Sequence, residues 1–286
     1  MKYKAILLSA VILAAALVGG CSSGGSGNTK ASDTPQSSAA EESAVQQSEE
    51  ESSVEQSNAE QSTETSDESS AESQPAGTPV DASWFNDAVF IGDSVTLKLS
   101  YYADNGDLGE TVFLCAGSLG YNNSLWDIDH EDNVHPVYNG EKVTIFDGVE
   151  RLKPKKIFVM MGMNDIGLYG VDDTIDAMKT VTDKLAEKCP DSVIYIESVT
   201  PMVSNSSLGD LNNDNIRAFD EKLKEVCAEK GYKYLDVYSA VSDENGDLVY
   251  EYCGDPPTDD NPNGMGLHFT DEGCKIWADY LKANVQ

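Results

Sequence analysis

Short apolar runs alternate with amphipathic stretches over the last two thirds of the chain. Most of the short runs are almost continuously hydrophobic, which is typical of parallel strands buried on both faces. The strand–helix alternation predicts an α/β fold, a three-layer α/β/α sandwich around a mostly parallel five-stranded sheet. The expected strands are Ala88–Ile91, Thr111–Leu114, Ile157–Met161, Val193–Val199 and Tyr232–Val237.

Helical periodicity appears between these runs. A final helix is expected to begin near Thr270, a suitable N-cap, and an earlier one to stop at Gly231. Residues 122–150 interrupt the alternation and are interpreted as an insertion, with a small hairpin around Asn139-Gly140. The apolar helix faces consist of Ile175, Met178, Val181 and Leu185; of Ile216, Phe219, Leu223 and Val226; and of Ile276, Trp277, Tyr280 and Leu281.

The N-terminus has the pattern of a targeting segment. Lys2 and Lys4 precede a largely apolar run of 14 residues, Ala5–Val18, which is too short to span a bilayer as a helix. Residues 1–20 are therefore predicted to be a signal peptide. The sequence LVGGC resembles a bacterial lipobox, which implies that Cys21 is acylated and anchors the protein to a membrane, outside the cytoplasm. The alternative is an ordinary signal peptide with an incidental cysteine.

A polar linker follows, and residues 21–80 are assigned to the acylated cysteine and this linker. From Ser22 to about Val80 the chain has no aromatic residue, twelve acidic residues and one lysine. Such a segment buries too little apolar area to offset its chain entropy, so we expect a disordered, extended tether. A binding tail is the other interpretation. Residues 81–286 are long enough for one well-buried domain.

The charge of this domain narrows the choice of partners. Twelve of the 50 acidic and three of the 19 basic residues precede residue 81, which leaves 38 against 16 and a net charge of −22. Nucleic acids and anionic lipid surfaces are poor partners for such a domain, whereas neutral glycans and small esters fit. Its five cysteines are odd in number and lack a CxxC spacing, so neither a zinc knuckle nor a complete disulfide framework is indicated, although one disulfide is possible.

Chemistry-bearing residues stand where the predicted strands end, which is where sites form in open parallel sheets. Gly92-Asp93-Ser94 follows the first strand, Ala116–Gly120 the second and Gly162–Asp165 the third, and Gly266–Thr270 precedes the last helix. This order resembles the four blocks of the SGNH/GDSL hydrolase superfamily, across essentially all of residues 86–286. The resemblance implies an SGNH hydrolase/flavodoxin-like sheet and a serine nucleophile.

The resemblance also assigns roles. Ser94 is the expected nucleophile and His268 its base, because a serine hydroxyl needs a base within hydrogen-bond reach. His130 and His135 lie in the polar insertion and are expected to be surface histidines. The oxyanion hole would consist of the Ser94 N–H, the Gly120 N–H and the Asn164 amide. Gly117 is the alternative to Gly120.

Asp93 and Asp165 are expected to support turns. Tyr121 and Trp126 are expected either to line a substrate cleft or to pack in the core or a lid. Two acidic segments, Asp104–Asp107 and Asp243–Asp247, are interpreted as turns, because each contains Asn-Gly and neither has the spaced ligands and distal Glu of a calcium loop.

The chain departs from the family in one place. Family members carry an Asp three residues before the His to orient the imidazole, and Met265 stands there. Asp259 or Asp260 is the expected substitute, because the surrounding Pro-, Asn- and Gly-rich segment must turn repeatedly. Asp255 would need a longer loop. A backbone carbonyl, a water molecule or a Ser–His dyad are the other possibilities.

The sequence thus predicts a serine esterase that hydrolyses acyl esters, acetyl above all, on carbohydrate or cell-wall glycan through an acyl-enzyme at Ser94. It predicts no cofactor, no metal and no nucleic-acid partner. A lipase or lysophospholipase, or a glycan O-acetyltransferase of the same fold, is the alternative enzyme. A catalytically silent glycan-binding lipoprotein is the alternative from another class.

Overall fold

The structure, a computed structural model, describes residues 78–286. The expected signal peptide, Cys21 and nearly all of the acidic linker lie outside the described residues. None of the helices within 78–286 combines the length and the apolar character needed to cross a membrane.

Five parallel strands form the central sheet in the order β2-β1-β5-β6-β7. This confirms the predicted α/β fold and all five expected strands, whose ends differ from expectation by one or two residues. The strands are β1 (Ala88–Gly92), β2 (Val112–Cys115), β5 (Lys156–Met160), β6 (Val193–Glu197) and β7 (Lys233–Leu235).

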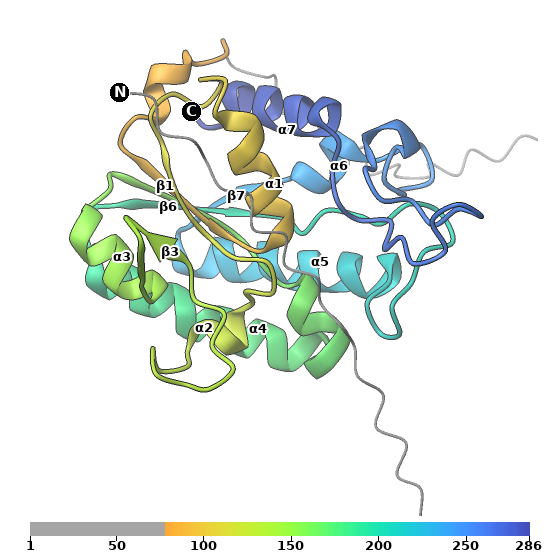
Figure 1. The fold of residues 1–286 in the computed structure, drawn as a ribbon. Coiled ribbons are helices and arrows are strands. Elements are labelled where there is room, and N and C mark those ends of the chain that lie inside the picture. Colours follow the sequence, from red (N-terminus) through yellow and green to blue (C-terminus); the bar gives the residue numbers. More distant parts are fainter. Residues whose placement is uncertain (1–77) are drawn as a thin grey trace, which may run out of the picture. The chain divides into compact units, whose positions relative to one another are not determined.

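Helices cover both faces of the sheet, which completes the three-layer sandwich (Figure 1). One face carries α1 (Ser94–Ala103), α6 (Val237–Val241) and α7 (Asp271–Asn284), with α7 in contact with the other two. The opposite face carries α3 (Ile145–Leu152), α4 (Met163–Lys188) and α5 (Asn213–Lys230). Helix α4 is interrupted at Gly170, where the backbone leaves helical geometry.

The expected helix ends are observed. Thr270 caps α7 by accepting the Gly273 N–H at 3.2 Å, and α5 stops at Gly231 in the left-handed conformation. Two short 3-10 helices, η1 (Ala82–Phe85) and η2 (Tyr250–Tyr252), complete the framework.

The insertion contains the predicted hairpin and two helices that the pattern did not reveal. Strands β3 (Val137–Tyr138) and β4 (Glu141–Lys142) pair antiparallel around Asn139-Gly140, both at positive φ as a tight hairpin turn requires. The added helices are α2 (Tyr121–Ser124) and α3. Both are short, and α3 depends on a local cap in which Thr144 Oγ1 accepts the Asp147 N–H at 3.0 Å.

An aromatic row crosses the sheet on one face. Phe113, Phe90, Phe158 and Tyr195 occupy matching positions on β2, β1, β5 and β6. Successive ring centroids lie 5.1, 4.4 and 4.6 Å apart, and each pair is stacked. Each such pair contributes about 0.5–1.5 kcal/mol beyond its buried area, so the register of four strands is fixed by side chains as well as by the backbone.

The five cysteines of the described part are all unpaired, and no disulfide forms among them. Cys189, Cys227, Cys253 and Cys274 are buried, and Cys115 is partly buried. They therefore act as small core side chains in this domain.

A buried carboxyl group joins the sheet to α7. Glu197, at the end of β6, is 1% exposed, and its Oε2 accepts a hydrogen bond from the indole N–H of Trp277 at 2.6 Å. Burial raises the pKa of Glu197 to about 8, and the hydrogen bond from Trp277 offsets only part of this rise. At neutral pH this carboxyl group is therefore mostly protonated in the folded protein.

Replacing Glu197 with Gln should flatten the dependence of stability on pH. The folded-state pKa is raised, so the stabilising contribution of Glu197 is complete below the unfolded pKa of about 4.5 and is lost as pH rises to about 8. In that window the wild type should lose up to roughly 1.4 kcal/mol per pH unit relative to Glu197→Gln, whose amide oxygen still accepts the indole N–H. Thermal or urea unfolding at several pH values measures this. Parallel stability curves for the two proteins would contradict it.

Candidate active site

Ser94 is the first residue of α1 and lies two residues after the end of β1 at Gly92. Asp93 caps this helix, because its Oδ1 accepts the Val95 N–H at 2.9 Å. Asp93 is fully buried, and burial raises its pKa to about 7. The short turn from Gly92 through Asp93 thus places the Ser94 hydroxyl at the carboxyl edge of the sheet, beside a helix N-terminus.

His268 links the serine to a carboxylate. Its Nε2 lies 2.9 Å from Ser94 Oγ, and its Nδ1 lies 2.6 Å from Asp255 Oδ2. If Nδ1 carries the proton and donates a hydrogen bond to Asp255, Nε2 presents a lone pair to the serine hydroxyl. The structure therefore brings together a Ser–His–Asp arrangement with the geometry of an activated nucleophile.

The expectation that Asp259 or Asp260 orients the histidine is wrong. Cys253 and Phe269 form an antiparallel bridge, and Gly254 N–H donates to the carbonyl of His268 at 2.7 Å. This pairing places Asp255 directly beside His268. Residues 256–265 form the loop between them, and Asp259 and Asp260 lie exposed on it. The longer loop that Asp255 needs is present, stabilised at its base by backbone pairing.

Several donors converge on the Asp255 carboxylate. Its Oδ1 accepts the backbone N–H groups of Leu267 and His268, at 3.1 and 3.0 Å. Burial alone would raise the pKa of Asp255, but the hydrogen bonds from the His268 side chain and backbone, its charge, and the Leu267 N–H outweigh burial and lower it. Asp255 therefore stays ionised at neutral pH and holds the imidazole in one orientation.

The two expected oxyanion donors outside α1 lie next to each other. Asn164, at the start of α4, donates through Nδ2 to the carbonyl of Leu119 at 3.0 Å, so its amide reaches the loop that contains Gly120. Gly120 is buried, whereas the alternative Gly117 is exposed. The Gly120 N–H donates to Asn123 Oδ1 at 2.8 Å. A substrate oxygen would therefore have to replace this amide oxygen.

The other candidate residues are two histidines and two aromatic residues. His130 is exposed as expected, but His135 is 2% exposed and its Nε2 contacts the Trp126 carbonyl at 2.9 Å, so the expectation of a surface histidine is wrong for His135. The hydrophobic pattern gave no signal for this burial, because it results from packing within the insertion. Of the two aromatic residues, Tyr121 is a fully buried core residue.

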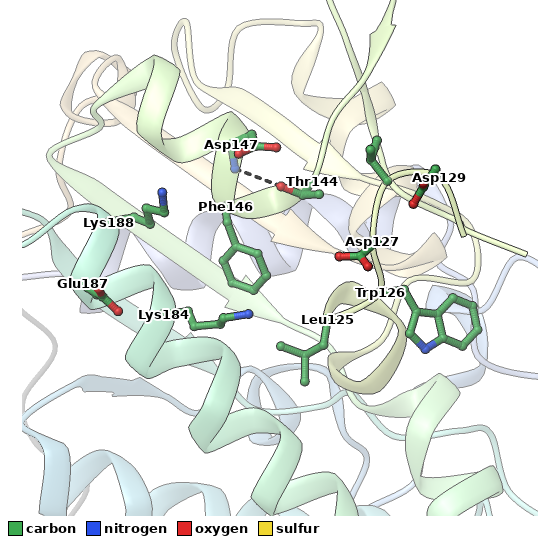
Figure 2. Close-up of a pocket in the computed structure, with 11 residues that line it drawn as sticks. Leu125, Trp126, Asp127, Asp129, Thr144, Phe146, Asp147, Lys184, Glu187 and Lys188 are labelled. Carbon is green, nitrogen blue, oxygen red and sulfur yellow. Dashed lines mark hydrogen bonds between the residues drawn. The ribbon is translucent and has the colours of Figure 1, made fainter. Parts of the chain in front are cut away.

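Trp126 lines a cavity of about 630 Å³ between the insertion and the second half of α4 (Figure 2). Phe146 forms part of its wall, and the Lys184 ammonium lies 4.8 Å from the ring centroid of Phe146. No member of the Ser–His–Asp arrangement lines this cavity. Its other lining residues are Leu125, Asp127, Ile128, Asp129, Thr144, Asp147, Glu187 and Lys188.

Comparison with known families agrees with this geometry. Residues 90–276, well over half of the chain, match the GDSL-like Lipase/Acylhydrolase family. The chain therefore belongs to this family, whose members act on ester substrates. No curated protein is similar enough in sequence to count as a match.

Solved structures also match the chain, at low sequence identity. A Streptococcus pneumonia protein, described provisionally as a platelet activating factor, is 18% identical with a TM-score of 0.51, over 68% of this chain and 82% of its own. A carbohydrate esterase family 3 protein from Talaromyces cellulolyticus is 14% identical with a TM-score of 0.46, over 69% and 95%. The periplasmic domain of a lipopolysaccharide acetyltransferase from Salmonella ser. Paratyphi A is 18% identical with a TM-score of 0.46, over 70% and 83%.

The contacts of Asp255 give a direct prediction with matched controls. Replacing Asp255 with Asn should lower kcat for p-nitrophenyl acetate by roughly 10²- to 10⁴-fold, because the amide favours the wrong histidine tautomer. Asp259→Asn and Asp260→Asn change the same residue type on the same loop and should keep nearly wild-type rates. A large loss in either control, or none in Asp255→Asn, would contradict the assignment.

Proposed function

We propose that this protein is a serine esterase that hydrolyses acyl esters through an acyl-enzyme at Ser94. The observation that carries the proposal is the chain of contacts from Ser94 Oγ through His268 to Asp255, at 2.9 and 2.6 Å. Membership of the GDSL-like Lipase/Acylhydrolase family supports the reaction class. A silent binding protein would not need these three groups at hydrogen-bond distance.

The proposed reaction has two halves. Ser94 Oγ attacks the ester carbonyl while His268 Nε2 takes its proton, and the same histidine returns the proton to the departing alcohol. Water then attacks the acyl-serine with His268 again as base, which releases the acid and restores Ser94. The backbone N–H of Ser94, the Asn164 amide and the Gly120 N–H stabilise the oxygen that becomes negative in both halves. Asp255 stabilises the imidazolium that forms each time.

We propose small acyl groups, acetyl above all, on carbohydrate or cell-wall glycan as the substrate. The domain beyond residue 80 has a net charge of −22, which opposes anionic lipid surfaces and suits neutral polymers. The proposal also places the domain outside the cytoplasm, held by an acylated Cys21. Its support is the LVGGC sequence at the end of the N-terminal apolar run.

Acyl-chain length tests the substrate class. On p-nitrophenyl esters, kcat/KM should be highest for acetate and fall with octanoate, because a long acyl chain needs a continuous apolar lining. Acetate release from O-acetylated xylan and O-acetylated peptidoglycan should depend on Ser94, with Ser94→Ala as the inactive control. A steady rise of kcat/KM with chain length would contradict this proposal and indicate a lipase instead.

A further inference from the structure

Asp165 is a buried carboxylate at the start of α4, only 2% exposed, and it follows Asn164 directly. Its two oxygens accept hydrogen bonds from the first residues of α2. Oδ2 accepts the Tyr121 N–H at 2.7 Å, and Oδ1 accepts the backbone and side-chain N–H groups of Asn122 at 2.9 and 3.0 Å. Asp165 thus caps a helix that belongs to a different part of the chain.

Helix α2 needs this distant cap because its own N-cap residue is Gly120, which has no side chain. The approach is close: a Cβ placed on Gly120 would lie 2.4 Å from Asp165 Oδ2. Glycine is therefore required here by the close approach of the carboxylate. The two residues form one packed unit at the edge of the site.

The consequence concerns the two oxyanion donors. Asn164 holds the Leu119 carbonyl, and Asp165 holds the next N–H groups, those of Tyr121 and Asn122. Gly120 lies between these anchors, so the segment that carries its N–H is held on both sides by two adjacent residues of α4. The N–H itself donates to Asn123 Oδ1 at 2.8 Å in this structure. We propose that Asp165 is a positioning residue of the oxyanion hole, which holds in place the segment that carries the Gly120 N–H.

This role rests on the proposed esterase function, in which Gly120 and Asn164 stabilise the transition state. An amide at position 165 keeps only one acceptor oxygen, so at least one of the three hydrogen bonds is lost and its NH₂ group faces a backbone N–H. The loop would then shift without losing the fold. Because oxyanion stabilisation acts on the transition state, the loss should appear in kcat and leave KM nearly unchanged.

The experiment compares Asp165→Asn with Asp220→Asn in the full protein. Asp220 is a matched control: it is 7% exposed, accepts a backbone N–H from Val199 at 2.9 Å, and lies on α5 outside the Ser–His–Asp arrangement. On p-nitrophenyl acetate, Asp165→Asn should lose roughly 10- to 100-fold in kcat with KM within about twofold. Asp220→Asn should keep the wild-type kcat for its folded fraction, whatever its effect on stability.

Two further measurements separate positioning from general destabilisation. Affinity for a trifluoromethyl ketone, whose serine adduct carries the oxyanion, should fall in Asp165→Asn by a factor similar to that in kcat. Removing the carboxylate also removes the clash with a Cβ at position 120, so the losses of Gly120→Ala and Asp165→Ala should be far from additive in the double variant. Three outcomes would overturn the role of Asp165: an unchanged kcat in Asp165→Asn, an equal loss of kcat in Asp220→Asn, or additive losses in the double variant. None of them would contradict the esterase function, provided that the wild type is active. An inactive wild type would overturn the proposed function, and this role with it.

Discussion

Parallel pairing of the strands determines where Ser94, Gly120 and Asn164 can lie. Gly92 at the end of β1 pairs with Cys115 at the end of β2 and with Met160 at the end of β5. The three segments that leave these strands carry Ser94, Gly120 and Asn164, so backbone register alone brings them to one edge. The aromatic row across β2, β1, β5 and β6 strengthens this register from within the core. His268 does not follow one of these strands. It is positioned by pairing between its own segment and the segment that carries Asp255.

The difference between strand pairing and loop contacts explains which parts of the site the sequence could predict. Continuous apolar runs identified all five strands, and the motifs at their ends identified the residues that meet there. The partner of His268 could not be found in this way, because it depends on a bridge between Cys253 and Phe269 across a loop of irregular backbone. The burial of His135 and the short helices α2 and α3 were missed for the same reason. His135 is buried by packing within the insertion, α2 is capped by the distant Asp165 and α3 by the local Thr144, and none of these contacts leaves a periodic pattern.

Buried carboxyl groups connect the stability of the domain to its chemistry. Asp93, Asp165, Glu197 and Asp220 are each under 10% exposed, and burial raises the pKa of all four. Each accepts at least one N–H hydrogen bond, and two of them adjoin Ser94 and Asn164. Burying such groups costs free energy that a purely apolar interior would avoid. Asp93, Asp165 and Asp220 accept backbone N–H groups at helix starts or beyond a strand end, whereas Glu197 accepts the indole N–H of Trp277.

The central claim is that Ser94 is a nucleophile activated by His268. Mass spectrometry after treatment with a fluorophosphonate tests it most directly, because this reagent reacts with activated serines whatever the natural ester is. The account predicts a single adduct on Ser94, no adduct in Ser94→Ala, and much slower labelling in His268→Ala. A wild-type protein that stays unlabelled, or an adduct on another residue, would contradict it.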